Sequence, residues 1–206
     1  MRYSFPMLLP IAIERVWHNV SKWYYRIISP LIAWLWGIKH GKNPIFQGKT
    51  IIRTRKVGEI QIGDNVIFNS QQTSNLVGLL GPTVLDTRGG GRIEIGDCSG
   101  FSSVVMSARN LIKVGSHVKV GGNVRIFDHD FHSLEPGYRR TAEDRMHIRS
   151  KPVIIEDDCF IGTNAIILKG THLGLRTIVA AGSVVFGLDV PPDSMVKGNP
   201  AQIIAR

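Results

Sequence analysis

The sequence predicts an all-β solenoid, a parallel β-helix preceded by an α-helical segment, and three observations lead to this prediction. Aliphatic residues recur at every sixth position in the C-terminal part of the chain. Glycine is abundant, with 22 residues in 206, as expected for a fold with many tight turns. Near the N-terminus, apolar residues instead recur at three- and four-residue steps, which is the spacing of an amphipathic helix.

The six-residue period is clearest from Ile155 onward, where the chain divides into six consecutive units. The first position of each unit is aliphatic: Ile155, Ile161, Ile167, Leu173, Val179 and Val185. The fifth position is mostly small: Cys159, Ala165, Thr171, Thr177, Ser183 and Asp189. A helix would turn these positions by about 240° per unit and spread them over three sides, whereas a strand returns to the same face after six residues. Short strands joined by turns therefore fit the pattern.

Weaker copies of the unit lie upstream, at Ile62, at Ile95 and over three units from Val114 to Phe131. Three units would make one coil, and stacked coils would bury a continuous aliphatic column. Two stretches lose the period, residues 69–92 and residues 132–154. The second stretch is polar and separates one complete coil from the next, so we expect it to be a functional loop inserted into the β-helix.

The N-terminal segment differs from the rest in charge and composition. We expect residues 1–45 to form a basic, aromatic-rich helical segment, with the amphipathic helix over residues 7–39, and residues 46–206 to form the β-helix domain. Residues 1–60 hold ten Lys and Arg but only Glu14 and Glu59, a balance of +8 out of the chain's +9. Because the cations lie among Trp, Tyr and Ile, peripheral contact of residues 1–45 with an anionic membrane is a candidate interaction, and nucleic acid is not expected as a partner. A helix packed on the coil or on another subunit is the favoured expectation, and the membrane contact is its alternative.

Cellular location follows from two further features. Cys98 and Cys159 are too few for a disulfide framework and fall inside repeat units, which predicts packed free thiols in a reducing cytoplasm. No secretory signal opens the chain, and the apolar run at residues 31–38 is shorter than the about 20 residues of a membrane span. We expect a cytoplasmic protein, with peripheral attachment to the inner face of the membrane as a further possibility.

Two histidines stand where the last complete coil gives way to the loop. His129 and His132 flank Asp130 and Phe131 in the segment DHDFHS. Acyl transfer to an alcohol needs a base near neutral pH, and histidine has a suitable ordinary pKa. From these residues alone, catalysis, a structural or solvated histidine pair and metal binding all remain open. His117 and His172 hold repeat positions beside turns and are expected in surface or packing roles.

Several linked motifs give the chain a family resemblance. The repeats, the segment HSLEPGYRR, the restart KPVIIEDDCFIG and the ending VPPDSMVKGNPAQII resemble the hexapeptide-repeat acyltransferases, over roughly residues 38–206. They are similar to the galactoside, maltose and Nod-factor acetyltransferases and closer to the O-acetyltransferases of capsule and lipopolysaccharide biosynthesis. The resemblance implies a left-handed β-helix, a homotrimer, and transfer of acetyl from acetyl coenzyme A to a hydroxyl of a sugar or surface-polysaccharide precursor, with no metal required.

The resemblance also implies roles for residues at the start of the loop. The family's base is a His followed by a Pro-Leu-Asp-Pro-like stretch, and His132 matches it, with Ser133 in place of the first proline. His129 is the competing assignment, either as base or as a residue that helps to bind the acceptor. Ser102 matches an acceptor-binding Asn of the sugar acetyltransferases, and Asp130 is assigned to acceptor binding as well.

For the donor, the resemblance implies a groove between neighbouring subunits. Thr163, Ala181 and Gly182 match positions where the backbone contacts the pantetheine arm, and small residues allow that close approach. The basic residue that the family often has after its final Pro-x motif is Gln202 here. Lys197 is therefore assigned to the coenzyme phosphates, with Arg206 as an alternative.

Three hypotheses for function follow. The leading one is an O-acetyltransferase acting by direct attack, because the chain lacks a Gly-x-Ser-x-Gly elbow and its cysteines occupy packing positions. The second is a metal hydratase of the carbonic anhydrase type on the same fold, which needs three histidines around zinc, and His117, His129 and His132 do not show the spacing of that family. The third is a non-catalytic scaffold that binds a membrane or a glycan-synthesis complex. The loop at residues 132–154 also carries five cations: Arg139, Arg140, Arg145, Arg149 and Lys151. They are compatible with binding of phosphate or an acidic glycan, and equally with plain solvation beside the acidic residues of the same loop.

Overall fold

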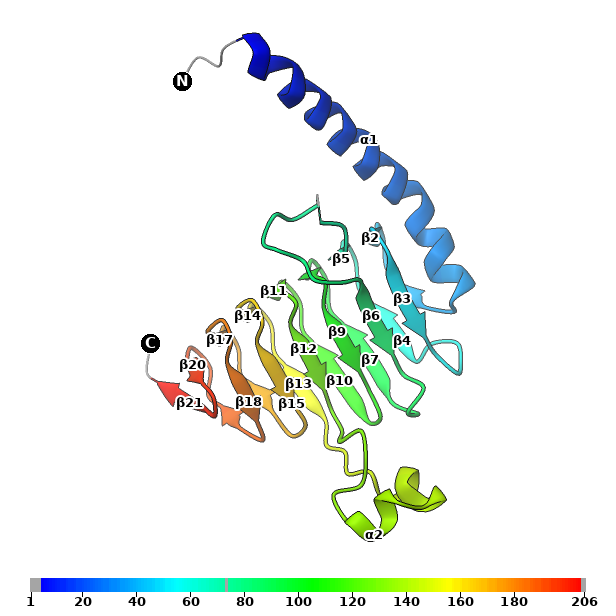
Figure 1. Cartoon of the computed structure of the whole chain (residues 1–206), viewed down its shortest axis with the longest axis vertical. Helices are drawn as coiled ribbons and strands as arrows, with labels where there is room; N and C mark the ends of the chain where they lie inside the picture. Colours follow the sequence, from blue (N-terminus) through cyan, green and yellow to red (C-terminus); the bar gives the residue numbers. More distant parts are fainter. Residues whose placement is uncertain (1–4, 73, 205–206) are drawn as a thin grey trace.

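The chain winds through three sheets in turn and contributes one short strand to each, which makes the predicted left-handed parallel β-helix (Figure 1). The structure is a computed structural model that describes residues 5–72 and 74–204. Every pairing between the strands named below is parallel, apart from the last one, between β20 and β21. The all-β fold class with an N-terminal helix is confirmed.

The three sheets are named A, B and C, in the order in which the chain visits them. Sheet A contains β1 (Lys39–His40), β4 (Ile60–Ile62), β7 (Arg92–Ile95), β10 (Leu111–Val114), β13 (Val153–Ile155), β16 (His172–Leu173) and β19 (Asp189–Val190). Sheet B contains β2 (Ile45–Gln47), β5 (Ile67–Asn69), β8 (Gly100–Ser102), β11 (Lys119–Gly122), β14 (Phe160–Ile161), β17 (Ile178–Val179), β20 (Met195–Gly198) and β21 (Ala201–Ile204). Sheet C contains β3 (Thr50–Arg53), β6 (Thr83–Asp86), β9 (Val105–Ser107), β12 (Arg125–Phe127), β15 (Ile166–Leu168) and β18 (Val184–Phe186).

The core is a set of columns, because a residue that points inward stacks on its counterpart one coil away. The predicted first positions from Ile155 to Val185 are all buried, and so are the predicted fifth positions from Cys159 to Ser183. Sheet B begins with an aromatic column in which Phe68 stacks on Phe46 and Phe101, at ring-centroid distances of 5.2 and 5.0 Å. Such columns exclude water from the whole length of the solenoid, and this burial is the main force that stabilises it.

The corners between the sheets need a left-handed backbone at fixed places. At successive A–B corners a non-glycine residue has a positive φ: Asn65, Cys98, His117, Asp158, Arg176 and Asp193. Asn and Asp tolerate this conformation well, so the turn chemistry agrees with the repeat at half of these corners. Cys98 is one of these turn residues and only partly buried, so the expectation that both cysteines pack inside holds only for Cys159.

Both ends of the β-helix are covered, which protects the sheet edges. Helix α1 (Phe5–Leu35) lies against the first coil, where Ser29 Oγ accepts a hydrogen bond from the Phe46 N–H at 2.8 Å. The helix ends before Gly37, which has φ 65°, and the Ile38 N–H closes the last turn on the Ala33 carbonyl at 2.9 Å. At the other end β21 folds back on β20 in antiparallel pairing.

The two interruptions differ in the structure. Residues 69–92 lose the sequence period but keep part of the coil, because they contain strand β6, which pairs with β3 and β9. The true excursion is residues 70–82, a loop between β5 and β6. The second interruption leaves the side of the β-helix between β12 and β13 and carries helix α2 (Pro136–Arg139) and the 3₁₀ helix η1 (Ala142–His147) (Figure 1).

Candidate functional site

The predicted site residues divide between two corners of the β-helix. Ser102 ends β8, and Thr163 lies two residues after the end of β14, which places both at the B–C corner. His129, Asp130 and His132 follow β12 and precede β13, which places them at the C–A corner where the loop begins. Within one chain, therefore, the two histidines and Ser102, the predicted acceptor-binding residue, lie at different edges of the β-helix.

His132 is paired with a carboxylate that comes from the loop itself. Its Nδ1 lies 2.7 Å from Asp144 Oδ2, while Asp144 Oδ1 accepts the Ser133 N–H at 2.7 Å. The hydrogen bond from His132, together with that from Ser133, lowers the pKa of Asp144, so this carboxylate is ionised at neutral pH. Because an ionised carboxylate can only accept, the ring must donate from Nδ1, and Nε2 of the neutral ring then carries the lone pair.

The His132 ring is open to an incoming molecule. Its side chain is 69% exposed, and Asp144 is 15% exposed behind it. Among the residues that the structure describes, Nε2 has no hydrogen-bond partner. The pair thus has the arrangement of a general base whose orientation and tautomer are fixed by a carboxylate.

His129 occupies a different environment. Its Nδ1 lies 2.8 Å from Asp128 Oδ1, and the side chain is only 9% exposed. The same buried Asp128 accepts the backbone N–H groups of Arg109 and Asn110 at 2.8 and 2.7 Å. The ring of His129 also packs on Phe131, with centroids 4.8 Å apart. These contacts tie the corner to the preceding coil and cover most of the ring.

Asp130 is held by a lysine from the next coil. Lys169 Nζ pairs with Asp130 Oδ1, and both side chains are largely buried. Lys169 also lies 5.2 Å from the ring centroid of Phe186. Asp130 Oδ2 is buried without a hydrogen-bond partner in the part of the chain that the structure describes. Asp130 therefore serves mainly in this ion pair and is not exposed to a ligand.

The predicted donor-binding residues line up in successive coils. Thr163 follows β14, Ala181 and Gly182 follow β17, and Lys197 lies in β20, so all four lie at or near the C-terminal ends of sheet B strands. The Gly182 N–H bonds the Thr163 carbonyl at 2.9 Å. Ala181 and Lys197 are exposed, and open space surrounds the position of a Cβ at Gly182. The alternative Arg206 lies outside the described residues.

A groove of about 400 Å³ lies on sheet B beside this column, under the loop at 70–82. Its lining combines apolar residues with Asn75, Ser102, Lys119 and Thr163. Asn75 Nδ2 donates to Ser102 Oγ at 2.9 Å, and Asn123 fixes the loop by bonding Leu80 N and Gly78 O. The loop therefore places the Asn75 amide against Ser102, the predicted acceptor-binding residue.

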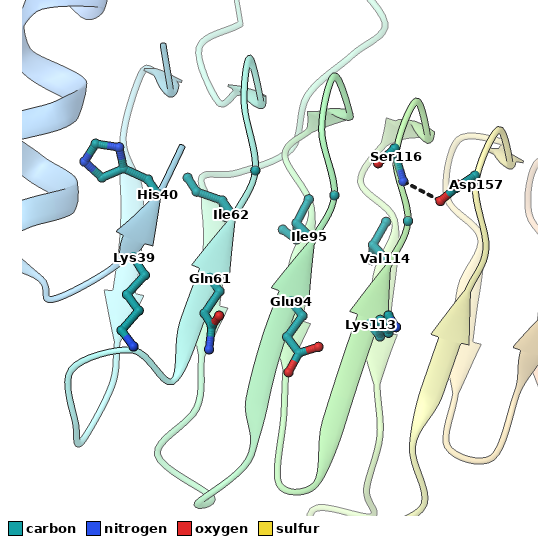
Figure 2. A pocket seen from close by; sticks show the side chains of 13 residues that line it. Lys39, His40, Gln61, Ile62, Glu94, Ile95, Lys113, Val114, Ser116 and Asp157 are labelled. Atoms are coloured by element: carbon teal, nitrogen blue, oxygen red, sulfur yellow. Dashed lines mark hydrogen bonds between the residues drawn. The ribbon is translucent and has the colours of Figure 1, made fainter. Parts of the chain in front are cut away.

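A second groove, of about 480 Å³, lies on sheet A and contains none of the predicted site residues. Figure 2 shows Lys39, Gln61 and Glu94 on neighbouring strands of its wall. Its upper rim is a structural ladder, in which the Ser116 N–H donates to Asp157 Oδ1 at 2.8 Å. Hydrogen bonds between coils explain this rim without a ligand.

Among the described residues, His117, His172 and Cys159 are used in turns and packing rather than gathered into a site. Within residues 5–72 and 74–204, no group of three His, Cys, Asp or Glu side chains is placed to hold a metal ion. His117 forms the turn at an A–B corner, away from His129 and His132. His172 is bound to Glu156 and Asp189, and burial raises the pKa of Cys159 to about 11.

Two partners of the site have no signal in the sequence. Asp144 lies twelve positions after His132 in an aperiodic loop, and only the folding of η1 brings the two together. Asn75 reaches Ser102 across 27 positions. Several loop cations are used locally: Arg139 Nη1 donates to Ser133 O at 3.1 Å, and Arg149 lies 4.0 Å from Glu135.

Comparison with known proteins agrees with the repeat pattern. A family model described as the hexapeptide repeat of succinyl-transferase matches residues 152–186. The chain therefore contains hexapeptide repeats over these residues. A hexapeptide-repeat acetyltransferase of Vibrio cholerae, solved with acetyl coenzyme A, is 28% identical with a TM-score of 0.57, over 95% of this chain and 87% of that one. A maltose O-acetyltransferase of Clostridium difficile is 19% identical with a TM-score of 0.54, over 95% and 87% of the two chains, which shows a shared fold.

A curated relative matches this chain over a shorter stretch. The 2,3,4,5-tetrahydropyridine-2,6-dicarboxylate N-acetyltransferase of Staphylococcus aureus is 53% identical over 57 residues. That match spans 28% of this chain and 23% of the relative. The predicted resemblance to hexapeptide-repeat acyltransferases is therefore confirmed for the repeats and the fold.

Proposed function

We propose that this hexapeptide-repeat protein is an O-acetyltransferase that moves an acetyl group from acetyl coenzyme A to a hydroxyl of a sugar or glycan precursor. The observation that carries the proposal is the His132–Asp144 pair, with an open Nε2, on a β-helix shared with an acetyltransferase solved with acetyl coenzyme A. The groove on sheet B supplies amide, hydroxyl and ammonium groups that suit a hydroxylated acceptor.

The reaction follows from the tautomer that Asp144 selects. The acceptor O–H gives its proton to His132 Nε2 while its oxygen attacks the thioester carbonyl carbon. Asp144 stabilises the imidazolium that results. The tetrahedral intermediate then collapses, the carbon–sulfur bond breaks, and the proton on Nε2 passes to the departing coenzyme A thiolate. The products are an acetyl ester and free coenzyme A, and no acyl-enzyme is needed.

A homotrimer accounts for the separation of the predicted residues. Ser102 and Thr163 lie at the B–C corner and His132 at the C–A corner, so a site that uses all three needs residues from two subunits. A cyclic trimer requires two different complementary faces on each subunit. The outer faces of sheets B and C both carry apolar side chains, such as Phe160 on B and Phe186 on C, which are 50% and 58% exposed. We place the subunit contacts on these two faces.

Transfer to an amine is the second candidate function, because the Staphylococcus aureus relative is named an N-acetyltransferase. The same base serves either acceptor, so the product distinguishes them. The cytoplasm supplies acetyl coenzyme A and is the proposed location. A membrane-spanning anchor is not part of the proposal, since no helix in the described part of the chain is long and apolar enough to cross a bilayer.

The test is coenzyme A release from acetyl coenzyme A in the presence of a panel of nucleotide sugars, oligosaccharides and their amino-sugar counterparts. We expect release that depends on a hydroxylated acceptor, and an acetylated product that hydroxylamine cleaves, as it cleaves esters and not amides. A product that resists hydroxylamine would replace the proposal by N-acetylation. No acceptor-dependent release, together with no coenzyme A binding by calorimetry, would favour the scaffold hypothesis.

A further inference from the structure

Helix α1 carries a stripe of large apolar side chains that nothing in the described chain covers. The stripe includes Val16, Trp17, Val20, Trp23, Ile27 and Trp34, each at least 51% exposed. At 3.6 residues per turn, these positions fall within about 120° of the helix circumference. Trp17, Trp23 and Trp34 are 66%, 68% and 71% exposed, which is unusual for the largest apolar side chain.

The opposite side of the helix is the one that meets the β-helix. Ser29 and Ala33 are fully buried against the first coil, and Ile32 is partly buried there. On the helical wheel these residues lie across from Val20 and Ile27. The stripe therefore faces away from the first coil, and Figure 1 shows most of α1 extending beyond the body of the β-helix.

Cations lie beside the C-terminal end of the stripe. The Gly58 N–H donates to the Gly37 carbonyl at 2.9 Å, which brings the turn at residues 54–58 against the end of α1. Arg55 and Lys56 are exposed in this turn, and Val57, which follows Lys56, is 79% exposed. An apolar, tryptophan-rich stripe next to exposed cations is the combination that binds the headgroup region of an anionic bilayer.

We propose that the stripe on α1 docks into the surface of an anionic membrane, with the helix in the plane of the interface and Arg55 and Lys56 on the lipid headgroups. The +8 balance of residues 1–60, against +1 for residues 61–206, directs this end of the molecule toward negative charge. The helix lies on the membrane rather than crossing it, since no described helix has the length and apolarity of a span. The inference concerns a surface far from the acyl-transfer residues and does not depend on catalysis.

Flotation of the full chain with vesicles tests this proposal. We expect the protein to float with vesicles of phosphatidylcholine mixed with phosphatidylglycerol, to bind vesicles of phosphatidylcholine alone more weakly, and to detach as salt rises. The double variant Trp17→Glu, Trp23→Glu should weaken binding on the order of a hundredfold, because it removes two large apolar side chains from the interface. Arg55→Gln with Lys56→Gln should weaken binding to the anionic vesicles about tenfold.

A control variant introduces one glutamate off the stripe. Asn19 is exposed and lies outside the apolar arc, so Asn19→Glu should float almost as well as the unchanged protein. Unchanged far-ultraviolet dichroism and melting would show that each variant is folded. No flotation of the unchanged protein, or equal flotation of the double tryptophan variant, would overturn the proposal. If the unchanged protein does not bind vesicles and the double tryptophan variant forms a smaller assembly by light scattering, the stripe is a contact between subunits instead.

Discussion

Replacing Asp144 by Asn changes the proton on His132 while keeping most of the local geometry. Asp144 Oδ1 accepts the Ser133 N–H, and Oδ2 faces His132 Nδ1, each at 2.7 Å. An asparagine can keep its oxygen on Ser133 and turn its amide toward the ring. Nδ1 must then accept, so the neutral ring carries its proton on Nε2 and cannot take one from the acceptor.

The size of the effect follows from the exposure of the ring. General-base catalysis contributes about 10²–10⁴-fold to a rate. Because the His132 side chain is 69% exposed, water allows part of the population to adopt other rotamers and the active tautomer. We therefore expect a loss near the lower end, about a hundredfold in kcat, or about 2.7 kcal/mol of transition-state stabilisation. The KM for acetyl coenzyme A should change little, because the exchange alters the proton on His132 and none of the predicted donor-binding residues.

The assay is continuous detection of the coenzyme A thiol over a range of donor concentrations. Glu143→Gln is the matched control, because Glu143 lies in the same 3₁₀ helix and its carboxylate is 3.9 Å from His147 rather than from His132. This control should keep nearly full activity. Full activity of Asp144→Asn would refute the orienting role of this carboxylate. Equal losses in both variants would show that the loop, rather than the pair, had been damaged.

Three further predictions concern the β-helix. Hydrogen bonds to Glu156 and Asp189 raise the pKa of His172 above its ordinary 6.5. These pairs therefore stabilise the fold fully below about pH 6.5 and lose their contribution as the pH rises through the raised folded-state pKa. The Tm difference between the unchanged protein and His172→Gln should shrink from about pH 5.5 to about pH 9. Phe68→Ala should lower the free energy of unfolding by about 3–5 kcal/mol in denaturant titration, because Phe68 fills the middle of the aromatic column. Cys159 should resist alkylation at about pH 8 until the protein unfolds, as mass spectrometry of labelled peptides would show, because burial raises its pKa to about 11.

Each of these has a result that would contradict it. A Tm difference that grows with pH would mean that His172 is not held as a cation by its two carboxylates. A cost below about 1 kcal/mol for Phe68→Ala would mean that the column relaxes around the cavity. Rapid labelling of Cys159 in the folded protein, at a rate similar to that of an unfolded control, would mean that the fifth coil opens readily.

The fold was predictable because its driving force repeats along the sequence. Ile161 and Val179 are eighteen positions apart, both point inward, and both occupy the same column one coil apart. Strand β6 escaped prediction because it is a single strand between a loop and the glycine-rich corner at residues 89–91, so no neighbouring unit extends its pattern.

The site was only partly predictable, because its contacts depend on irregular segments. The position of His132 at the end of a coil is visible in the repeat, but its contact with Asp144 depends on how η1 folds. Likewise the loop at 70–82 looks like a loss of period, and only the bonds from Asn123 to Leu80 and Gly78 show that it folds over sheet B. Hydrogen bonds between irregular segments have no period, so pattern analysis cannot locate them.

The comparison of His132→Gln with His129→Gln, measured as kcat for acetyl transfer in the same assay, tests the central claim most directly. His132→Gln should lose about 10²–10⁴-fold in kcat, with acetyl coenzyme A still bound, because the open base is gone. His129→Gln should lose much less and should instead melt at a lower temperature, because that ring ties buried Asp128 to the corner. Full activity of His132→Gln, or a larger catalytic loss in His129→Gln at unchanged stability, would contradict the assignment of His132 as the base.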